Sequence, residues 1–306
     1  DERSGEEVAR LASVVDGGWD TLANAYADIV GVHENPEVQR TIGKKLAHVF
    51  EDELGDITKA EETYKYVLSV EPLDVDALSN LDRIYLSLES WPDLAQILEQ
   101  RIKAGGEAID LIEFHVRLGE IYETRVSDTD NAIRVFRRIF DELDRTNDAA
   151  IAALGRIYAA LGNWPELLPV NERELENASG DAAEADIRAK IGHLLAEQLG
   201  QHERAIETWK AVLDLRGEDA EALGALANLY EQQQMWRELI DVLERQCEAE
   251  TADDQRVNIL SRKARMFTEK LGQDGLALED WNRVLDLDFA NLAALRAISA
   301  IRPRQG

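Results

Sequence analysis

Cysteine, methionine and proline are scarce in this 306-residue chain, which contains one, two and six of them. The single thiol, Cys247, cannot close an internal disulfide, so the redox compartment stays open and the cytoplasm is the default. No apolar run approaches the roughly 18 residues that span a bilayer, and no basic-then-apolar secretory signal is present, so membrane insertion is not expected. The sequence does not begin with Met, as expected of a fragment excised or processed from a longer chain.

Basic residues are outnumbered, because 34 Lys and Arg face 61 Asp and Glu, for a formal net charge of -27. A chain of this charge repels nucleic acid and anionic membrane surfaces, so no nucleic-acid partner is expected. The imbalance is uneven, since residues 256–306 carry nine bases and six acids. Solvated acidic helix faces would account for most of the charge, and they keep an elongated array soluble.

Tryptophan is rare as well, but its spacing is regular. Trp19, Trp91, Trp164 and Trp236 are separated by 72, 73 and 72 residues. The same steps separate four alanines, each followed four residues later by an aromatic residue: Ala60 with Tyr64, Ala132 with Phe136, Ala205 with Trp209, and Ala277 with Trp281. A spacing kept over most of the chain predicts a structural repeat.

Each long repeat divides again into units of about 36 residues. Small or nearly small residues mark the units at Ala47, Asp82, Gly119, Gly155, Gly192, Ala227 and Ala264. Within a unit the apolar spacing is helical, as in ALGRIYAAL, where Leu154, Ile157, Tyr158 and Leu161 share one stripe. No stretch alternates long enough for a strand. The sequence therefore predicts an all-α array of antiparallel helix pairs, which must stack because one pair cannot bury its own apolar face.

These motifs resemble the tetratricopeptide repeat over residues 5–301. The segments LGRIY and LGEIY place Leu154, Gly155 and Tyr158, and their counterparts, as that family does, and Pro72 follows Ala60 at the family's distance. The resemblance implies a right-handed α-α superhelix, a single solenoid domain over residues 1–306 with seven to eight hairpins. The chain departs from the family pattern in two ways. Its units are longer than the family's about 34 residues, and the second-helix alanine is replaced in alternate units by Leu94, Leu167 and Leu239.

The tryptophans are expected to be structural. Pro165 follows Trp164 and Pro92 follows Trp91, as at the first position of a helix, where a missing N–H costs nothing. In related repeats a large ring at this place packs in the angle between helices. We therefore expect core positions rather than a ligand pocket at eight aromatic residues: Trp19, Trp91, Trp164, Trp236, Tyr64, Phe136, Trp209 and Trp281.

No catalytic constellation is visible, so the chain is not expected to be an enzyme or to bind a cofactor. The nucleophile-elbow, phosphate-loop and zinc-helix motifs are absent. None of the five histidines pairs with another histidine or with the cysteine at ligand spacing, so no metal site is expected. Cys247 falls where neighbouring long repeats have Leu175 and Ile102, which predicts a buried apolar thiol.

The resemblance also implies that first helices line a concave groove in which a protein or extended peptide binds. The residues expected to face this groove are Lys44, His48, Arg83, Glu120, Arg156, His193, Asn228 and Arg265. Small residues beside them, among them Ala189 and Ala196, would leave room for a partner. We hypothesise that Arg83, Arg156 and Arg265 hold an acidic or carboxylate-bearing segment. The alternative is that these arginines pair with groove acids such as Glu120 and Glu123.

The leading interpretation is a non-catalytic scaffold that binds a protein or peptide. A regulatory or sensory arm of a larger enzyme or signalling protein is the second reading, and an RNA-binding helical array is disfavoured by the charge. Trp19 is expected in the second half of a unit whose first half is missing, and the last first-helix pattern is broken by Arg302 and Pro303. We therefore expect a continuation of the chain or head-to-tail self-association through the ends.

Overall fold

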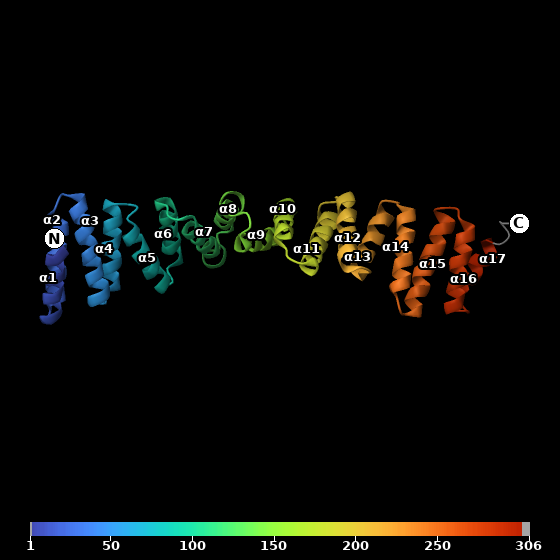
Figure 1. The fold of residues 1–306 in the computed structure, drawn as a ribbon, viewed down its shortest axis with the longest axis horizontal. Coiled ribbons are helices and arrows are strands. Elements are labelled where there is room, and N and C mark those ends of the chain that lie inside the picture. Colours follow the sequence, from blue (N-terminus) through green and yellow to red (C-terminus); the bar gives the residue numbers. More distant parts are fainter. Residues whose placement is uncertain (1, 302–306) are drawn as a thin grey trace. The chain divides into compact units, whose positions relative to one another are not determined.

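The structure is a computed structural model that describes residues 2–301, with side chains from Glu7 onward. Within this range it contains 17 α-helices and four π-helical turns and no strand, which confirms the all-α class. Figure 1 shows the helices succeeding one another from α1 (Glu2–Val14) to α17 (Leu292–Ile301). The expected break at Arg302 and Pro303 lies outside the described residues.

The chain divides into two compact units, one up to Ile157 and one from Tyr158 onward, and the boundary falls inside α9 (Asp148–Leu161). Unit 1 also holds α1, α2 (Gly18–Val32), α3 (Pro36–His48), α4 (Ile57–Val70), α5 (Val75–Ser87), α6 (Trp91–Ala104), α7 (Ala108–Ile121) and α8 (Thr129–Arg138). Unit 2 holds α10 (Trp164–Asn177), α11 (Asp181–His193), α12 (His202–Arg216), α13 (Ala220–Gln232), α14 (Trp236–Ala249), α15 (Asp253–Glu269), α16 (Asp274–Leu287) and α17. The single domain over residues 1–306 stays a prediction.

Within each unit, odd-numbered first helices and even-numbered second helices form successive hairpins that pack on their neighbours. The hairpin of Trp19 differs from expectation, because α1 supplies the first helix that the sequence pattern did not reveal and packs on α2. At the other end, α17 has no second helix among the described residues, and Leu292 and Leu295 on it are exposed. Stacking of this end on another copy stays a prediction.

Two hairpin lengths alternate, and this alternation produces the 72-residue double repeat. First helices from α3 to α15 start at residues 36, 75, 108, 148, 181, 220 and 253. In three of the four longer hairpins the first helix ends in a π-helical turn: η1 (Val49–Glu53), η2 (Tyr122–Val126) and η4 (Leu194–Gln198). A fourth turn, η3 (Ile139–Leu143), ends α8. Because a π turn accommodates one additional residue, it absorbs part of the length by which these units exceed the family's.

The turn inside each hairpin contains one residue with positive φ, and these positions recur every 72 or 73 residues in alternate hairpins. They are Gly17, Gly55, Glu89, Ser127, Gly162, Gly200, Gln234 and Gly272. Glycine suits this left-handed conformation, as at Gly162 (φ 65°), because a Cβ crowds the following carbonyl there. Helix starts are closed by side chains, as where Asp219 accepts the backbone N–H of Ala222 at 2.9 Å.

The core of a long hairpin contains a large ring from the second helix, and in two of these hairpins the ring packs against a glycine of the first helix. The second-helix alanines Ala60, Ala132, Ala205 and Ala277 are fully buried, as are Tyr64 and Trp209, with Phe136 and Trp281 nearly so. A Cβ built on Gly119 would lie 2.6 Å from Cζ of Phe136, and one on Gly192 would lie 2.7 Å from the indole of Trp209. The small positions therefore exist because the two helices of a hairpin approach closely around a large ring.

Gly119→Ala and Gly192→Ala should each lower the free energy of unfolding by about 1–3 kcal/mol, because the added methyl overpacks a ring that cannot move aside. Gly224→Ala is the matched control: it lies within α13, and a Cβ there would meet nothing within 4 Å. The control should stabilise by up to about 1 kcal/mol through helix propensity. Urea unfolding followed by circular dichroism measures all three; destabilisation of equal size at Gly224 would contradict the packing explanation.

The four regularly spaced tryptophans begin or lie near the start of second helices, as expected, but they are only partly buried. Trp91, Trp164 and Trp236 are the first residues of α6, α10 and α14. The guanidinium of Arg125 lies 4.7 Å from the ring centre of Trp91, and Nζ of Lys270 lies 5.1 Å from that of Trp236. The rings of Trp91 and Trp236 are thus partly buried and each has a cation over one face. Their structural role stays a prediction.

One member of the apolar stripe on α9 also departs from expectation, since Leu161 is 57% exposed at the end of the helix. Cys247, by contrast, is buried as the sequence predicted. The leucines that replace the second-helix alanine, Leu94, Leu167 and Leu239, are buried as well. The alternation of alanine and leucine therefore matches two kinds of core rather than a loss of the repeat.

Trp209→Ala should cost about 3–5 kcal/mol, the range for a fully buried large aromatic. Trp164→Ala should cost roughly half as much, because part of that ring is already in water. Chemical denaturation of both variants tests the comparison. Equal losses would show that the half-exposed ring carries as much of the core as the buried one.

Candidate functional site

In unit 1, the residues expected to face a groove lie on first helices and pair with acids from neighbouring elements. Lys44 contacts Asp76 at 2.6 Å and Asp74 at 3.2 Å. The imidazole of His48 stands edge-on to Tyr64, whose hydroxyl lies 3.3 Å from its Nδ1, and Asp52 lies 3.5 Å from the same nitrogen. We call this surface, formed by the first helices, the first-helix face.

Two arginines on this face bridge successive first helices. Arg83 on α5 forms an ion pair with Glu51 on η1, and Arg156 on α9 binds Glu123 on η2 through two hydrogen bonds of 3.0 and 2.8 Å. Glu51 also accepts a hydrogen bond of 3.3 Å from the hydroxyl of Tyr64. Burial and this carboxylate raise the pKa of Tyr64, and the bond to Glu123 raises the pKa of Arg156. The alternative that the groove arginines pair with groove acids is thus realised at both positions, with Glu123 and not Glu120 as the partner of Arg156.

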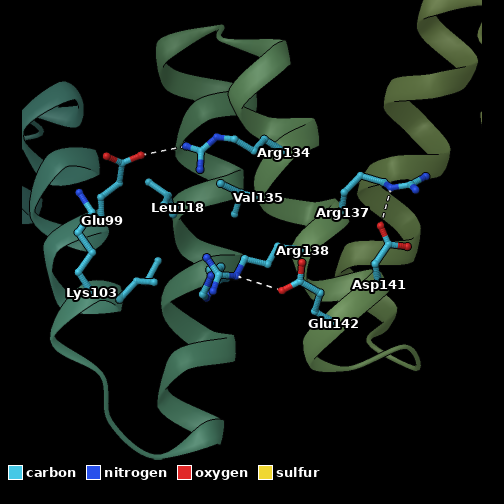
Figure 2. Close-up of a pocket in the computed structure, with 11 residues that line it drawn as sticks. Glu99, Lys103, Leu118, Arg134, Val135, Arg137, Arg138, Asp141 and Glu142 are labelled. Carbon is cyan, nitrogen blue, oxygen red and sulfur yellow. Dashed lines mark hydrogen bonds and ion pairs between the residues drawn. The ribbon is translucent and has the colours of Figure 1, made fainter.

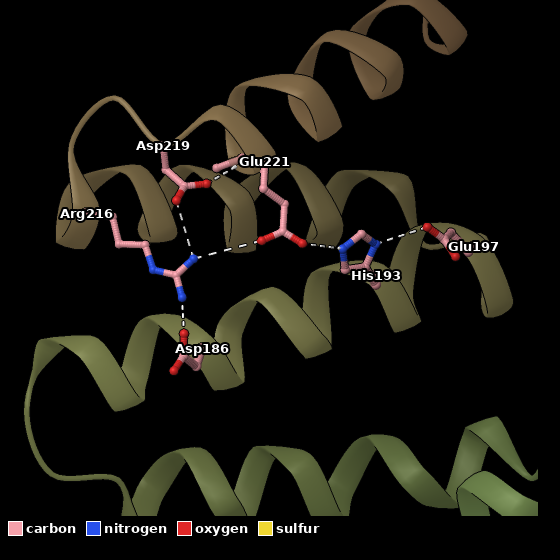
Figure 3. A network of polar contacts seen from close by, with 7 residues as sticks. Asp186, His193, Glu197, Arg216, Asp219 and Glu221 are labelled. Atoms are coloured by element: carbon pink, nitrogen blue, oxygen red, sulfur yellow. Dashed lines mark hydrogen bonds and ion pairs between the residues drawn. The ribbon is translucent and has the colours of Figure 1, made fainter.

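In unit 2, His193 is held between two carboxylates (Figure 3). Its Nδ1 lies 3.0 Å from Glu197 on η4, and its Nε2 lies 3.0 Å from Glu221 on α13. These contacts, with Glu221 the stronger, raise the pKa of His193, because only the protonated ring donates from both nitrogens. The ring also stands edge-on to Trp209 at 4.9 Å between centroids.

Arg216 on α12 extends the same network. It forms an ion pair with Asp186, and its Nη1 lies 3.4 Å from Asp219 and 3.9 Å from Glu221. Figure 3 shows the chain of contacts running from Asp186 through Arg216 and Glu221 to His193 and Glu197. Four carboxylates therefore surround one guanidinium and one imidazole, so negative charge predominates here.

A hollow of about 610 Å³ lies on the first-helix face of unit 2 beside this network. It is lined by His193, Ala196, Glu197, His202, Trp209, Ala220, Glu221, Gly224, Ala225, Asn228, Leu229 and Gln232. The volume is within the range of ligand pockets, and the floor is made of small and apolar residues with polar groups at the rim. We call it the α11–α13 hollow, because most of its lining comes from α11 with η4 and from α13.

The hollow brings together some of the expected residues and leaves others apart. His193 and Asn228 line it, together with Ala196 and Gly224, whereas Ala189 is buried outside it. Arg265 on α15 is exposed and forms no ion pair among the described residues, and Glu120 is likewise exposed. The sequence did not predict Glu221 or His202 as residues of this site. Glu197 could have been predicted, because it follows His193 by four residues, and side chains at that spacing meet on one face of a helix.

A second cavity, of about 580 Å³, lies in unit 1 among α6, α7, α8 and η3 (Figure 2). Its arginines are matched by acids: Arg134 contacts Glu99 at 3.0 Å, Arg137 contacts Asp141 at 2.8 Å, and Arg138 contacts Glu142 at 3.7 Å. The buried His115 in its lining has a lowered pKa because of burial. Its three arginines are thus paired with its three acids, and Lys103 adds a further positive charge to the lining.

The described residues contain no group of three or more His, Cys, Asp or Glu side chains that could hold a metal ion. Across residues 2–301, no helix has the length and apolar character needed to traverse a bilayer. The polar side chains that line the α11–α13 hollow are carboxylates, amides and imidazoles, which can form hydrogen bonds and ion pairs.

His193→Gln should reduce stability at about pH 5.5 and much less at about pH 8.5. The protonated ring bonds both carboxylates, so its stabilising contribution is present below the ordinary pKa and disappears as pH rises through the raised value in the folded state. Urea unfolding of both proteins across this range measures the difference. His33→Gln, at an exposed histidine without a carboxylate partner among the described residues, is the control. A wild-type advantage that does not shrink with rising pH would refute the paired imidazolium.

Comparison with known families agrees with this helical arrangement. The family model described as tetratricopeptide repeat matches residues 150–183 and 222–257. The second match covers α13 and α14 and so includes one wall of the α11–α13 hollow. The match and the succession of helix hairpins confirm the resemblance to the tetratricopeptide repeat, a fold of protein–protein interaction scaffolds. No curated protein matches the chain.

Solved structures with similar helical arrays share little sequence with this chain. YrrB, described as a TPR protein with an unusual peptide-binding site, is 17% identical over 63% of this chain and 98% of its own, with a TM-score of 0.37. A tetratricopeptide repeat protein from Parabacteroides merdae is 14% identical over 86% of this chain and 98% of its own, with a TM-score of 0.35. MamA is 18% identical over 62% of this chain and 86% of its own, with a TM-score of 0.33.

Proposed function

We propose that this chain is a non-catalytic scaffold that binds a protein or extended peptide segment along its first-helix face. The observation that carries the proposal is the α11–α13 hollow, which lies on this face and has a volume of about 610 Å³. Its floor of Ala196, Gly224 and Ala225 leaves room for side chains of a partner, and its polar rim can fix their orientation.

The sequence suggested that the partner segment is acidic and is held by Arg83, Arg156 and Arg265. In the structure, Arg83 and Arg156 already satisfy Glu51 and Glu123, so a partner carboxylate would have to compete with a carboxylate held in place. Arg265 alone has its guanidinium unpaired among the described residues. Of these three positions, an acidic contact is therefore supported only at Arg265 on α15.

Gly224→Leu should weaken peptide binding by about tenfold or more, because the side chain fills the α11–α13 hollow. The measurement is fluorescence anisotropy with peptides selected from a random display library on the immobilised chain. Gly275→Leu on the second helix α16 is the matched control, since a Cβ at either glycine meets nothing within 4 Å and both gain helix propensity.

The control should bind the selected peptides as the wild type does. If Gly224→Leu also binds every selected peptide with unchanged affinity, the first-helix face of unit 2 is not the binding surface, and the proposed function fails at this site.

A further inference from the structure

The α11–α13 hollow occupies the place where the equivalent repeats have an arginine of their own. Positions 72 or 73 residues apart are equivalent in the long repeat. One such set is Glu51, Glu123 and Ala196, and another is Arg83, Arg156 and Asn228. In unit 1 both pairs bridge successive first helices. In unit 2 neither the carboxylate nor the guanidinium is present, and the two residues that replace them both line the hollow.

The ring behind these positions changes as well, but independently of the pair, since Phe136 in the second long repeat has no hydroxyl and the Glu123–Arg156 pair is kept. In the first long repeat the hydroxyl of Tyr64 bonds to Glu51, and this buried carboxylate is the acceptor for Arg83. The equivalent of Tyr64 in unit 2 is Trp209, which has no hydroxyl and is fully buried. At the hollow the carboxylate, the guanidinium and the hydroxyl of the first long repeat are all absent, although α11 ends in a π-helical turn as α3 and α7 do.

The acceptors around the hollow nevertheless suit a cation. Glu197 and Glu221 have exposed side chains at its rim, and the amides of Asn228 and Gln232 offer two further oxygen atoms. Neither amide has a hydrogen-bond partner among the described residues. Arg216, the nearest guanidinium, is already held by Asp186 and Asp219. The rim therefore has more acceptor capacity than the chain itself uses.

We propose that the α11–α13 hollow receives an arginine side chain of the partner segment, in the position that Arg83 and Arg156 occupy elsewhere in the chain. This inference rests on the proposed function, since it names the chemistry of the segment bound at the same face. Arginine suits the site because its planar guanidinium binds two carboxylates, or a carboxylate and an amide, at once. A net charge of -27 on the chain favours the approach of such a basic segment.

His193 competes with the incoming arginine. It takes one oxygen from Glu197 on η4 and one from Glu221 on α13 when it is protonated. The other titratable or charged groups near it are Arg216 and His202, both on α12, which also packs Trp209 against the ring. Loss of the imidazolium proton frees both carboxylates, so binding of the arginine should tighten as pH rises from about 5.5 to 8.

The experiment uses the complete 306-residue chain and peptides selected on it from a random display library. The best peptide is synthesised with arginine and with citrulline, a neutral analogue of the same shape, at the enriched position. Its affinity is measured by fluorescence anisotropy on the wild type, on Ala196→Glu/Asn228→Arg and on Glu221→Gln. The double variant introduces the Glu–Arg pair seen in unit 1 and so fills the hollow. Glu221→Gln removes one exposed acceptor charge, and it tests the same inference if the double variant does not fold.

The expected result is enrichment of arginine, with about tenfold weaker binding for the citrulline peptide and for each of the two variants. His193→Gln should abolish the pH dependence of binding between pH 5.5 and 8. Enrichment of Asp or Glu, or equal affinity for the arginine and citrulline peptides, would overturn the inference. If such peptides still lose affinity on Gly224→Leu, the first-helix face binds partners and only the chemistry of the partner is wrong.

Discussion

The close approach of two helices around a single large ring is the contact on which each long hairpin depends. Phe136 and Trp209 lie where the facing first helix has Gly119 and Gly192, and even a methyl group at those glycines would overlap the ring. Because the ring fills the angle between the helices, one face of each first helix does not contribute to the core of its hairpin. Exposed side chains on that face can then differ from one repeat to the next without disturbing the core.

The sequence predicted the features that residue type and spacing determine, and it missed those that depend on exposure or on backbone hydrogen bonding. The step of 72 or 73 residues located the buried alanines and rings, because burial imposes the same residue sizes in every copy. The partial exposure of Trp91 and Trp164 was missed, since an amphipathic ring satisfies the spacing whether one of its faces or both are covered. The π turns were invisible for another reason: a wider turn changes hydrogen bonding, not composition.

The candidate site, too, was predicted only in part from the sequence. The row that contains His193 and Asn228 follows from helix register, and the structure places both residues at one hollow. Glu221 joins them from the next first helix, and such a contact depends on the stacking of hairpins, which spacing along the chain does not specify. Whether Arg83 and Arg156 were free or paired could not be decided from register either, because the distance to Glu51 and Glu123 is a tertiary quantity.

The ion pairs that bridge successive first helices also give the array a simple way to change. A Glu–Arg pair closes the gap between two neighbouring hairpins, and an Ala–Asn pair at the same place leaves it open. In the second long repeat only two substitutions, at Glu123 and Arg156, separate these states, and the contact of Phe136 with Gly119 is made without either side chain. Each gap can therefore gain or lose an open hollow by point mutation, so that the surface of such an array can change one gap at a time on a preserved framework.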